Sequence, residues 1–292
     1  MFFAQSKIVI MDQQRLEEVL AIAREVGWGA GDVLRSYYKG DIKDISDKKD
    51  GPVTKADIAA NNYIIENFHA KLGTEDFAYL SEETYDGNKI ERPWVWIIDP
   101  LDGTRDFIDQ TGEYAVHICL TNQAGRPVIS VVVVPEEEKL YFALKGSGTF
   151  VETRDGKVTP IKVSERSEPG ELYLVASRTH RDQRFQDMLD RLPFKDRNYV
   201  GSVGCKIAHI LEQKSDVYIS LSGKSAAKDW DFAAPELILT EAGGKFSYFA
   251  GNEVLYNQGD VVKWGGIMAS NGPCHEELCQ QAIAILEELD KA

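Results

Sequence analysis

Residues 94–104 read WVWIIDPLDGT, and this stretch decides how the rest of the chain is interpreted. Its first five residues are aromatic or β-branched, which is typical of a buried strand. Asp, Pro and Gly follow at once, so the strand should end in a tight turn. Asp99 and Asp102 can direct two carboxylates at one point there, while Gly103 lets the backbone approach closely. The turn therefore indicates a cation site; the alternative is an Asp that caps the following helix.

The sequence on both sides of this stretch predicts a sheet and two helices. Three further β-branched or aromatic runs, separated by Gly and Pro, should form successive strands of the same sheet. Upstream, apolar residues recur every three or four positions in two segments, which indicates amphipathic helices. The predicted strands are 115–121, 128–134 and 140–144, and the predicted helices are 12–38 and the segment from Thr54 to the stop at Gly73.

The second half of the chain alternates strand and helix patterns, which is typical of an α/β fold. A polar, glycine-rich stretch at 146–170 precedes it, and we place a domain boundary near Gly170. The expected fold class is thus α/β, with an α+β domain at 1–170 that carries the acidic motifs and an α/β domain at 171–292. Its predicted strands are 172–176, 217–221, 245–249 and 264–269, and its predicted helices are 182–192, 204–212, 230–242 and 276–289.

Composition narrows the possible functions. The chain has 292 residues, 43% of them hydrophobic, and a formal net charge of −14. A field of that sign repels nucleic acid and anionic membrane surfaces, so we expect neither as a partner. The four cysteines show no CxxC spacing, and the short apolar opening contains Lys7, so we expect a cytoplasmic protein without signal peptide or membrane span.

Further acidic residues stand at predicted loop edges. Glu82 and Glu83 follow the short apolar segment 78–80, and Asp231 opens a helix after Trp230. An acidic pair on its own is usually a solvated surface, but carboxylates gathered in one place repel one another unless cations neutralise them. Oxygen ligands without Cys or His favour Mg²⁺ or Mn²⁺ over zinc, and such ions commonly serve phosphate ester hydrolysis.

These motifs resemble the inositol monophosphatase superfamily of magnesium-dependent, lithium-sensitive phosphomonoesterases. The likeness rests on Asp57 in GPVTKAD, on Glu82-Glu83, on DPLDGT at 99–104, and on Trp230-Asp231 with eleven residues between it and Gly243-Gly244. The resemblance implies a layered αβαβα sandwich of the inositol monophosphatase and fructose-1,6-bisphosphatase type, with two or three Mg²⁺ ions, or Mn²⁺ in their place. It also allows a homodimer. The metal ligands it implies are Glu82, Asp99, the carbonyl of Leu101, Asp102 and Asp231.

The same resemblance implies that Asp57 and Thr104 together activate the attacking water. That chemistry is reasonable by itself, because a hydroxyl bonded to a carboxylate can orient a water that a metal has acidified. The structural alternatives are an N-cap for Thr104 and a first-turn carboxylate for Asp57. Gly103 and Thr104 are also expected at the substrate, Gly103 through its backbone N–H, and Glu83 is either beside the ligands or exposed.

Three stretches of the second half look like the 3′(2′),5′-bisphosphate nucleotidases of this superfamily. They are ASRTH at 176–180, GSVGCKIAHILE at 201–212 and WDFAAPE at 230–236, although Ser202-Val203 departs from the subgroup's frequent Gly-Ala. By this likeness His180, Ser202, Lys206 and Asp231 contact the substrate, and Lys206 pairs a phosphate. The alternatives are an exposed Lys206 early in a helix and a solvated His180.

We therefore expect a magnesium-dependent phosphatase that removes the 3′-phosphate of adenosine 3′,5′-bisphosphate to give AMP, which would clear a by-product of sulfur metabolism. Inositol monophosphatase or fructose-1,6-bisphosphatase activity at the same metal site is the alternative. A catalytically silent metal- or nucleotide-binding protein and a structural scaffold are two further readings. Both are disfavoured, because three separate loops would then share one chemistry without using it.

Overall fold

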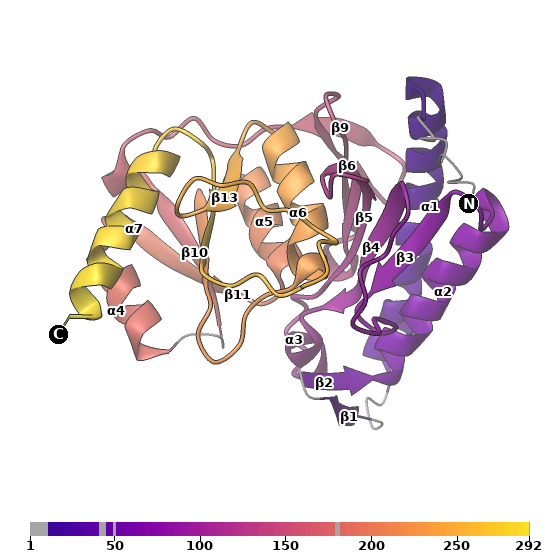
Figure 1. The fold of residues 1–292 in the computed structure, drawn as a ribbon, viewed down its shortest axis with the longest axis horizontal. Coiled ribbons are helices and arrows are strands. Elements are labelled where there is room, and N and C mark those ends of the chain that lie inside the picture. Colours follow the sequence, from indigo (N-terminus) through magenta and orange to yellow (C-terminus); the bar gives the residue numbers. More distant parts are fainter. Residues whose placement is uncertain (1–10, 41–44, 49–50, 179–181, 292) are drawn as a thin grey trace, which may run out of the picture.

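The computed structural model describes residues 11–40, 45–48, 51–178 and 182–291. These residues form five alternating layers (Figure 1). Helices α1 and α2 cover one face of a seven-stranded sheet, α5 and α6 lie between that sheet and a five-stranded one, and α4 and α7 cover the outer face of the smaller sheet. The αβαβα sandwich predicted from the sequence is confirmed.

The described helices are α1 Gln13–Tyr38, α2 Lys55–Leu72, α3 Thr104–Ile108, α4 Gln183–Arg191, α5 Val203–Leu211, α6 Asp229–Glu241 and α7 His275–Leu289. The described strands are β1 Ile45–Lys48, β2 Gly51–Thr54, β3 Phe77–Ser81, β4 Trp94–Asp102, β5 Ala115–Asn122, β6 Pro127–Val134, β7 Lys139–Leu144, β8 Thr149–Thr153, β9 Val158–Ile161, β10 Tyr173–Ser177, β11 Asp196–Val200, β12 Val217–Leu221, β13 Lys245–Tyr248 and β14 Gly266–Ser270. Among these residues no helix combines the length and hydrophobicity that a bilayer crossing requires.

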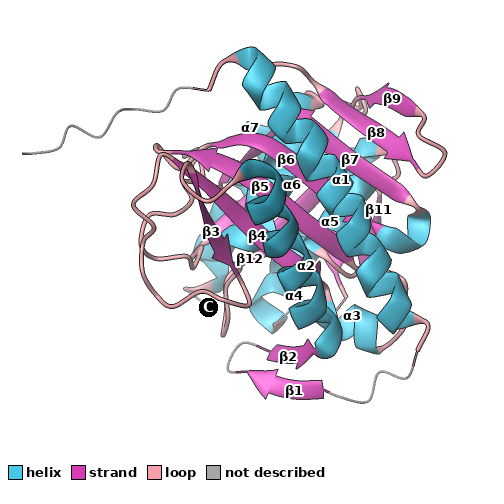
Figure 2. Ribbon diagram, turned by 90° about the vertical axis from the view of Figure 1, so that its right-hand side faces the viewer, coloured by secondary structure: helices cyan, strands magenta, loops and turns pink. Residues whose placement is uncertain are grey.

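The larger sheet runs in the order β3-β4-β5-β6-β7-β8-β9, and β1 and β2 form a separate hairpin. Side chains of β4 alternate between two cores: Val95 and Ile97 face α5 and α6, whereas Trp96 and Ile98 face α1 and α2. Because both faces are covered, the strand reads as one continuous apolar run. Figure 2 shows α1 and α2 lying across the sheet.

The pairing of β4 with β5 positions the acidic turn. The register is regular up to Asp99 and breaks between Asp99 and Asp102, so the DPLD segment leaves the ladder. On its other side β4 pairs in parallel with β3, and the N–H of Glu82 donates to the carbonyl of Ile98 at 3.2 Å. The sheet thus brings the Glu82 turn beside the end of β4.

The smaller sheet has the order β11-β10-β12-β14-β13, with β10, β11 and β12 mutually parallel. Its first strands end near α5 and α6, whose side chains are buried against both sheets. The predicted boundary near Gly170 falls between β9 and β10, which belong to different sheets; a division into two domains stays a prediction.

The structure also differs from the sequence-based expectation. The stretch 146–170 contains β8 and β9, and β11 and the β1–β2 hairpin were not predicted. The strand expected at 264–269 begins only at Gly266, because Gly265 has a φ of +105° and Trp264 stands in a loop with 57% of its surface exposed.

Candidate metal centre

Three carboxylates from two elements meet at one place. Asp99 and Asp102 come from the end of β4, and Asp231 is the third residue of α6. One carboxylate oxygen of each lies within 4.8 Å of those of the others. The N–H of Lys228 fixes Asp231 by donating to its Oδ2 at 2.7 Å. The sequence predicted this convergence of residues that are more than a hundred positions apart.

The fourth predicted ligand, Glu82, belongs to the same electrostatic cluster. Burial and the charges of Asp231 and Glu83 raise the pKa of Glu82 to about 8. Burial and the charges of Glu82, Asp102 and Asp231 raise the pKa of Asp99 well above its usual range. Burial and the charge of Asp102 raise the pKa of Asp231 to about 6. These carboxylates hold negative charge poorly in the absence of cations.

Asp102 is the exception, because donors surround it. Burial alone would raise its pKa, but the His117 ring, the charge of Lys206 and the Ser202 hydroxyl outweigh burial and lower the pKa to about 2. Its Oδ2 accepts from the Ser202 hydroxyl and from the N–H of Gly204 at 3.0 Å, and lies 3.2 Å from His117 Nε2. Asp102 is therefore an ionised carboxylate with a fixed orientation.

The turn after Asp102 requires glycine. Gly103 has a φ of +91°, and a Cβ there would lie 3.0 Å from the carbonyl oxygen of Glu113 and 3.2 Å from Ser202 Cβ. Gly103 is the N-cap residue of α3, and Thr104 is its first helical residue. Thr104 is thus not the N-cap that was the structural alternative for it.

Asp57 and Thr104 are hydrogen bonded across the site. The Thr104 hydroxyl lies 3.2 Å from Asp57 Oδ1 and 3.1 Å from the carbonyl oxygen of Leu101, both acceptors. Asp57 Oδ2 accepts from the N–H and the hydroxyl of Thr54, which forms a capping box at the start of α2. Asp57 therefore caps its own helix with one oxygen and holds Thr104 with the other, and burial raises its pKa.

The three predicted nucleotide contacts have different outcomes. His180 lies outside the described residues. The Ser202 hydroxyl is buried and donates to Asp102, and Lys206 is 3% exposed, with its ammonium donating to the carbonyls of Gly201 and Ser202 at 3.2 and 2.9 Å. In this structure both side chains bond to the turn before α5 and to Asp102, and their contact with a substrate stays a prediction. Lys206 is also not the exposed residue of the alternative reading.

Arg178, which lies in the ASRTH stretch, is engaged in ion pairs as well. Its guanidinium pairs with Asp106 and with Glu113, whose Oε2 also accepts from the N–H of Gly201 at 2.6 Å. A Cβ on Gly201 would overlap the Asp106 carboxylate, at 2.2 to 2.5 Å. This network joins α3 of the larger sheet's side to the strand ends of the smaller sheet.

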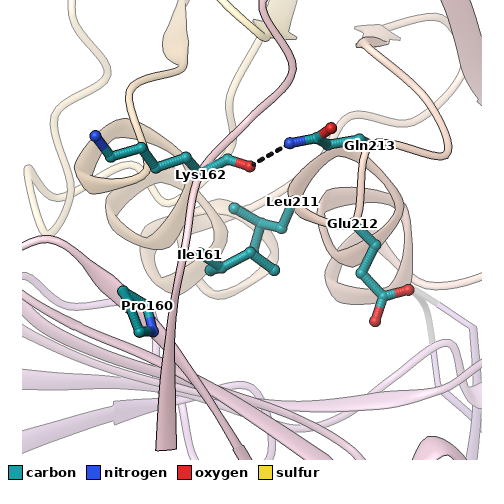
Figure 3. A pocket seen from close by; sticks show the side chains of 6 residues that line it. All are labelled: Pro160, Ile161, Lys162, Leu211, Glu212 and Gln213. Atoms are coloured by element: carbon teal, nitrogen blue, oxygen red, sulfur yellow. Dashed lines mark hydrogen bonds between the residues drawn. The ribbon is translucent and has the colours of Figure 1, made fainter.

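The residues present fit a hard divalent cation. Glu82, Asp99, Asp102 and Asp231 offer only oxygen donors, and burial and mutual repulsion raise the pKa of three of them, so a cation would favour their ionised forms. A separate surface hollow of about 460 Å³ shares no residue with this cluster (Figure 3). It is lined by Pro160, Ile161, Lys162, Leu211, Glu212 and Gln213.

Comparison with known proteins agrees with this geometry. Residues 15–289 match the sequence model of the inositol monophosphatase family. The chain belongs to the inositol monophosphatase family. The 3′(2′),5′-bisphosphate nucleotidase CysQ of Salmonella typhimurium is 32% identical over 245 residues, which cover 82% of this chain and 93% of that protein. CysQ of Escherichia coli strain K12 is 31% identical over the same shares.

Solved structures show the same family fold. An IMPase of Thermotoga maritima superposes with a TM-score of 0.78 at 23% identity, covering 93% of this chain and 99% of that one. CysQ of Bacteroides thetaiotaomicron, described as a bacterial member of the inositol monophosphatase family, gives a TM-score of 0.71 at 27% identity over 87% and 97% of the two chains. The protein is a metal-dependent phosphatase.

One residue at the centre of this phosphatase was missed in the sequence. His117 lies in β5 and contacts Asp102, yet no motif contains it. The signal was present: His117 is the only ionisable side chain apart from a cysteine in AVHICLTN, a strand whose other residues are apolar or small and polar. A histidine in a fully buried run needs partners, and here they are part of the metal centre.

Proposed function

We propose that this protein is an Mg²⁺-dependent phosphatase that hydrolyses the 3′-phosphate of adenosine 3′,5′-bisphosphate to AMP and phosphate. The observation that carries the proposal is the cluster of Asp99, Asp102 and Asp231 beside the hydrogen-bonded pair Asp57 and Thr104. Two relatives that are 32% and 31% identical to this chain are named 3′(2′),5′-bisphosphate nucleotidases, which supports the choice of substrate.

In this proposal Glu82, Asp99, the Leu101 carbonyl, Asp102 and Asp231 hold two or three ions. Bound Mg²⁺ would acidify a water and offset the charge of the phosphate. Oxygen-rich sites of this kind accept Mn²⁺ too. An acidic protein can thus bind an anionic substrate, because the local charge differs from the net charge of −14.

Thr104 and Asp57 position the nucleophile. Both neighbours of the Thr104 hydroxyl, Asp57 Oδ1 and the Leu101 carbonyl, are acceptors, so the single O–H hydrogen points toward them. Its lone pairs then accept a hydrogen bond from a water and orient the water oxygen for attack on phosphorus. Water supplies the oxygen of the new P–O bond and gives up one proton, the bond to the 3′ oxygen breaks, and that oxygen takes up a proton. It leaves as the nucleotide hydroxyl, so no proton is gained or lost overall.

A phosphate-release panel tests the proposal. It compares adenosine 3′,5′-bisphosphate, its sulfated relative, inositol 1-phosphate and fructose 1,6-bisphosphate, each with Mg²⁺, with Mg²⁺ plus Li⁺, and with EDTA. We expect the highest kcat/KM on the adenosine substrates, inhibition by Li⁺ and no release in EDTA. Faster release from inositol 1-phosphate or from the sugar bisphosphate would identify that compound as the substrate instead. Release in EDTA would reject the metal mechanism.

A further inference from the structure

His117 lies between two elements that carry predicted metal ligands. The ring is fully buried, with Nδ1 3.2 Å from the carbonyl oxygen of Trp230 and Nε2 3.2 Å from Asp102 Oδ2. A carbonyl only accepts, so Nδ1 carries a hydrogen and donates it to the residue that precedes Asp231. One side chain therefore contacts Asp102 directly and the Asp231 turn through its backbone.

The contacts on Asp102 are one-sided. The Ser202 hydroxyl, the Gly204 N–H and His117 Nε2 all reach the same oxygen, Oδ2. The Ser202 hydroxyl and the Gly204 N–H fill the two directions in which that oxygen accepts, and His117 Nε2 lies 3.2 Å from it, which leaves Oδ1 as the atom for an ion. The packing is close: a Cβ on Gly204 would lie 2.4 Å from His117 Nε2. Glycine at this position is what allows the ring to reach the carboxylate.

We propose that His117 is a positioning residue of the metal centre. It holds Asp102 so that Oδ1 is available to a cation, and it fixes the end of β4 relative to the start of α6. The inference rests on the proposed function, since it takes Asp102 and Asp231 as ligands. Partners of this kind orient metal ligands in many sites, and their loss commonly costs about 10- to 100-fold in metal affinity.

Two substitutions separate the two ring nitrogens. In His117→Asn the amide takes the place of Nδ1 and keeps the bond to Trp230, but it does not reach Asp102. In His117→Gln the longer amide places a donor near the position of Nε2 and gives up the bond to Trp230. His275→Asn is the matched control, because His275 is also buried and bonded at both nitrogens, to Ser247 and Ser270 at 2.8 Å each.

The readout is the binding of Mn²⁺ to the metal-stripped full chain in the absence of substrate, which electron paramagnetic resonance monitors. We expect the dissociation constant to rise at least tenfold in His117→Asn, to recover most of that loss in His117→Gln, and to stay within about twofold in His275→Asn. Unchanged binding in His117→Asn, or an equal loss in His275→Asn, would overturn the inference and leave the proposed function intact. Absence of Mn²⁺ binding to the unaltered protein would instead reject the proposed function.

A second variant covers the case in which His117→Asn does not fold. Gly204→Ala retains the histidine but pushes its ring away from Asp102, because the new methyl group would meet Nε2. We expect weaker Mn²⁺ binding in this variant too. Binding as tight as in the unaltered protein would show that contact between ring and carboxylate is not needed, and would count against the role of His117.

Discussion

Asp99 carries the conflict between stability and activity at the level of one residue. It is 1% exposed and faces the charges of Glu82, Asp102 and Asp231, which together with burial raise its pKa. Asp99→Asn keeps the shape and removes a buried carboxyl that must otherwise take up a proton or bear a repelled charge. We expect turnover to fall at least about a thousandfold, or about 4 kcal/mol in the barrier, while the unfolding midpoint in EDTA stays the same or rises.

Phosphate release at saturating Mg²⁺ and thermal unfolding in EDTA measure these two effects separately. A lowered midpoint would mean that Asp99 stabilises the fold through contacts other than those of the cluster. Turnover near that of the unaltered protein would remove Asp99 from the ligand set.

Thr104 allows a test of the nucleophile alone. Thr104→Val keeps the branched shape but loses the hydroxyl that lies between Asp57 Oδ1 and the Leu101 carbonyl. We expect kcat to fall about 10²- to 10⁴-fold, with the Mg²⁺ concentration for half-maximal rate changed less than threefold. Thr104→Ser restores the hydroxyl and should recover most of the rate. A large shift in the Mg²⁺ requirement would indicate instead that Thr104 shapes the metal centre.

At the scale of elements, Asn257 joins the Glu82 loop to α6. Its side-chain amide accepts from the N–H of Ile90 at 3.0 Å and donates to the carbonyl of Ile90 at 2.8 Å, while its backbone N–H donates to Asp229 at 2.6 Å. Its φ is +53°. Glycine adopts this backbone conformation readily, so Asn257→Gly keeps the backbone bond to Asp229 and removes only the two side-chain bonds to Ile90.

We expect amide hydrogen exchange in residues 82–92 of Asn257→Gly to accelerate about 30-fold, because two hydrogen bonds contribute about 2 kcal/mol to local stability. Gln110→Gly is the matched control, since Gln110 is exposed and has a similar φ of +54°. Equal acceleration in residues 82–92 in both variants would show that the introduction of glycine, and not the loss of the two hydrogen bonds to Ile90, is responsible.

The elements also show what sequence can predict. Strands covered on both faces, such as β4 and β6, have continuous apolar runs, so their positions were predicted within a few residues. β9 is an edge strand with mostly exposed side chains, and nothing in Val158–Ile161 marks it as a strand. The clustered acidic residues were predictable because they lie in local motifs. The role of Ser202 was not, because its hydroxyl reaches Asp102 only through the packing of the two sheets.

At the scale of the whole molecule, acid stability should depend on the outer layer. Burial, and to a lesser extent Lys245, lowers the pKa of His275 to about 4, and Ser247 and Ser270 bond its two nitrogens. The unfolded chain, with a histidine pKa of about 6.5, binds this proton first. The free energy of unfolding should therefore fall as pH drops from 6.5 to 4.

His275→Asn isolates that contribution. Between pH 6.5 and 4 its unfolding midpoint should fall by a few degrees less than that of the unaltered protein, since no proton binds at this position. Equal slopes in thermal melts across this range would exclude His275 as a source of acid sensitivity.

Above pH 7 the metal centre should control stability with the opposite sign. In the metal-free protein Glu82 has a pKa of about 8, raised from 4.5, so the folded state keeps a proton that the unfolded state has lost. Its free energy of unfolding should therefore decrease between pH 7 and 8, by about 1 kcal/mol per pH unit at most for each such carboxylate.

In the proposed site Mg²⁺ would bind the ionised carboxylates. Saturating Mg²⁺ should therefore flatten or reverse this slope, and it should raise the free energy of unfolding by about 2.7 kcal/mol at a hundred times its dissociation constant. Urea unfolding at pH 7.0, 7.5 and 8.0, in EDTA and in Mg²⁺, measures both effects. Glu82→Gln should show a shallower slope in EDTA, which separates this residue from cysteines that titrate in the unfolded chain. Stability that rises with pH in EDTA would mean that the carboxylates are not confined together in solution.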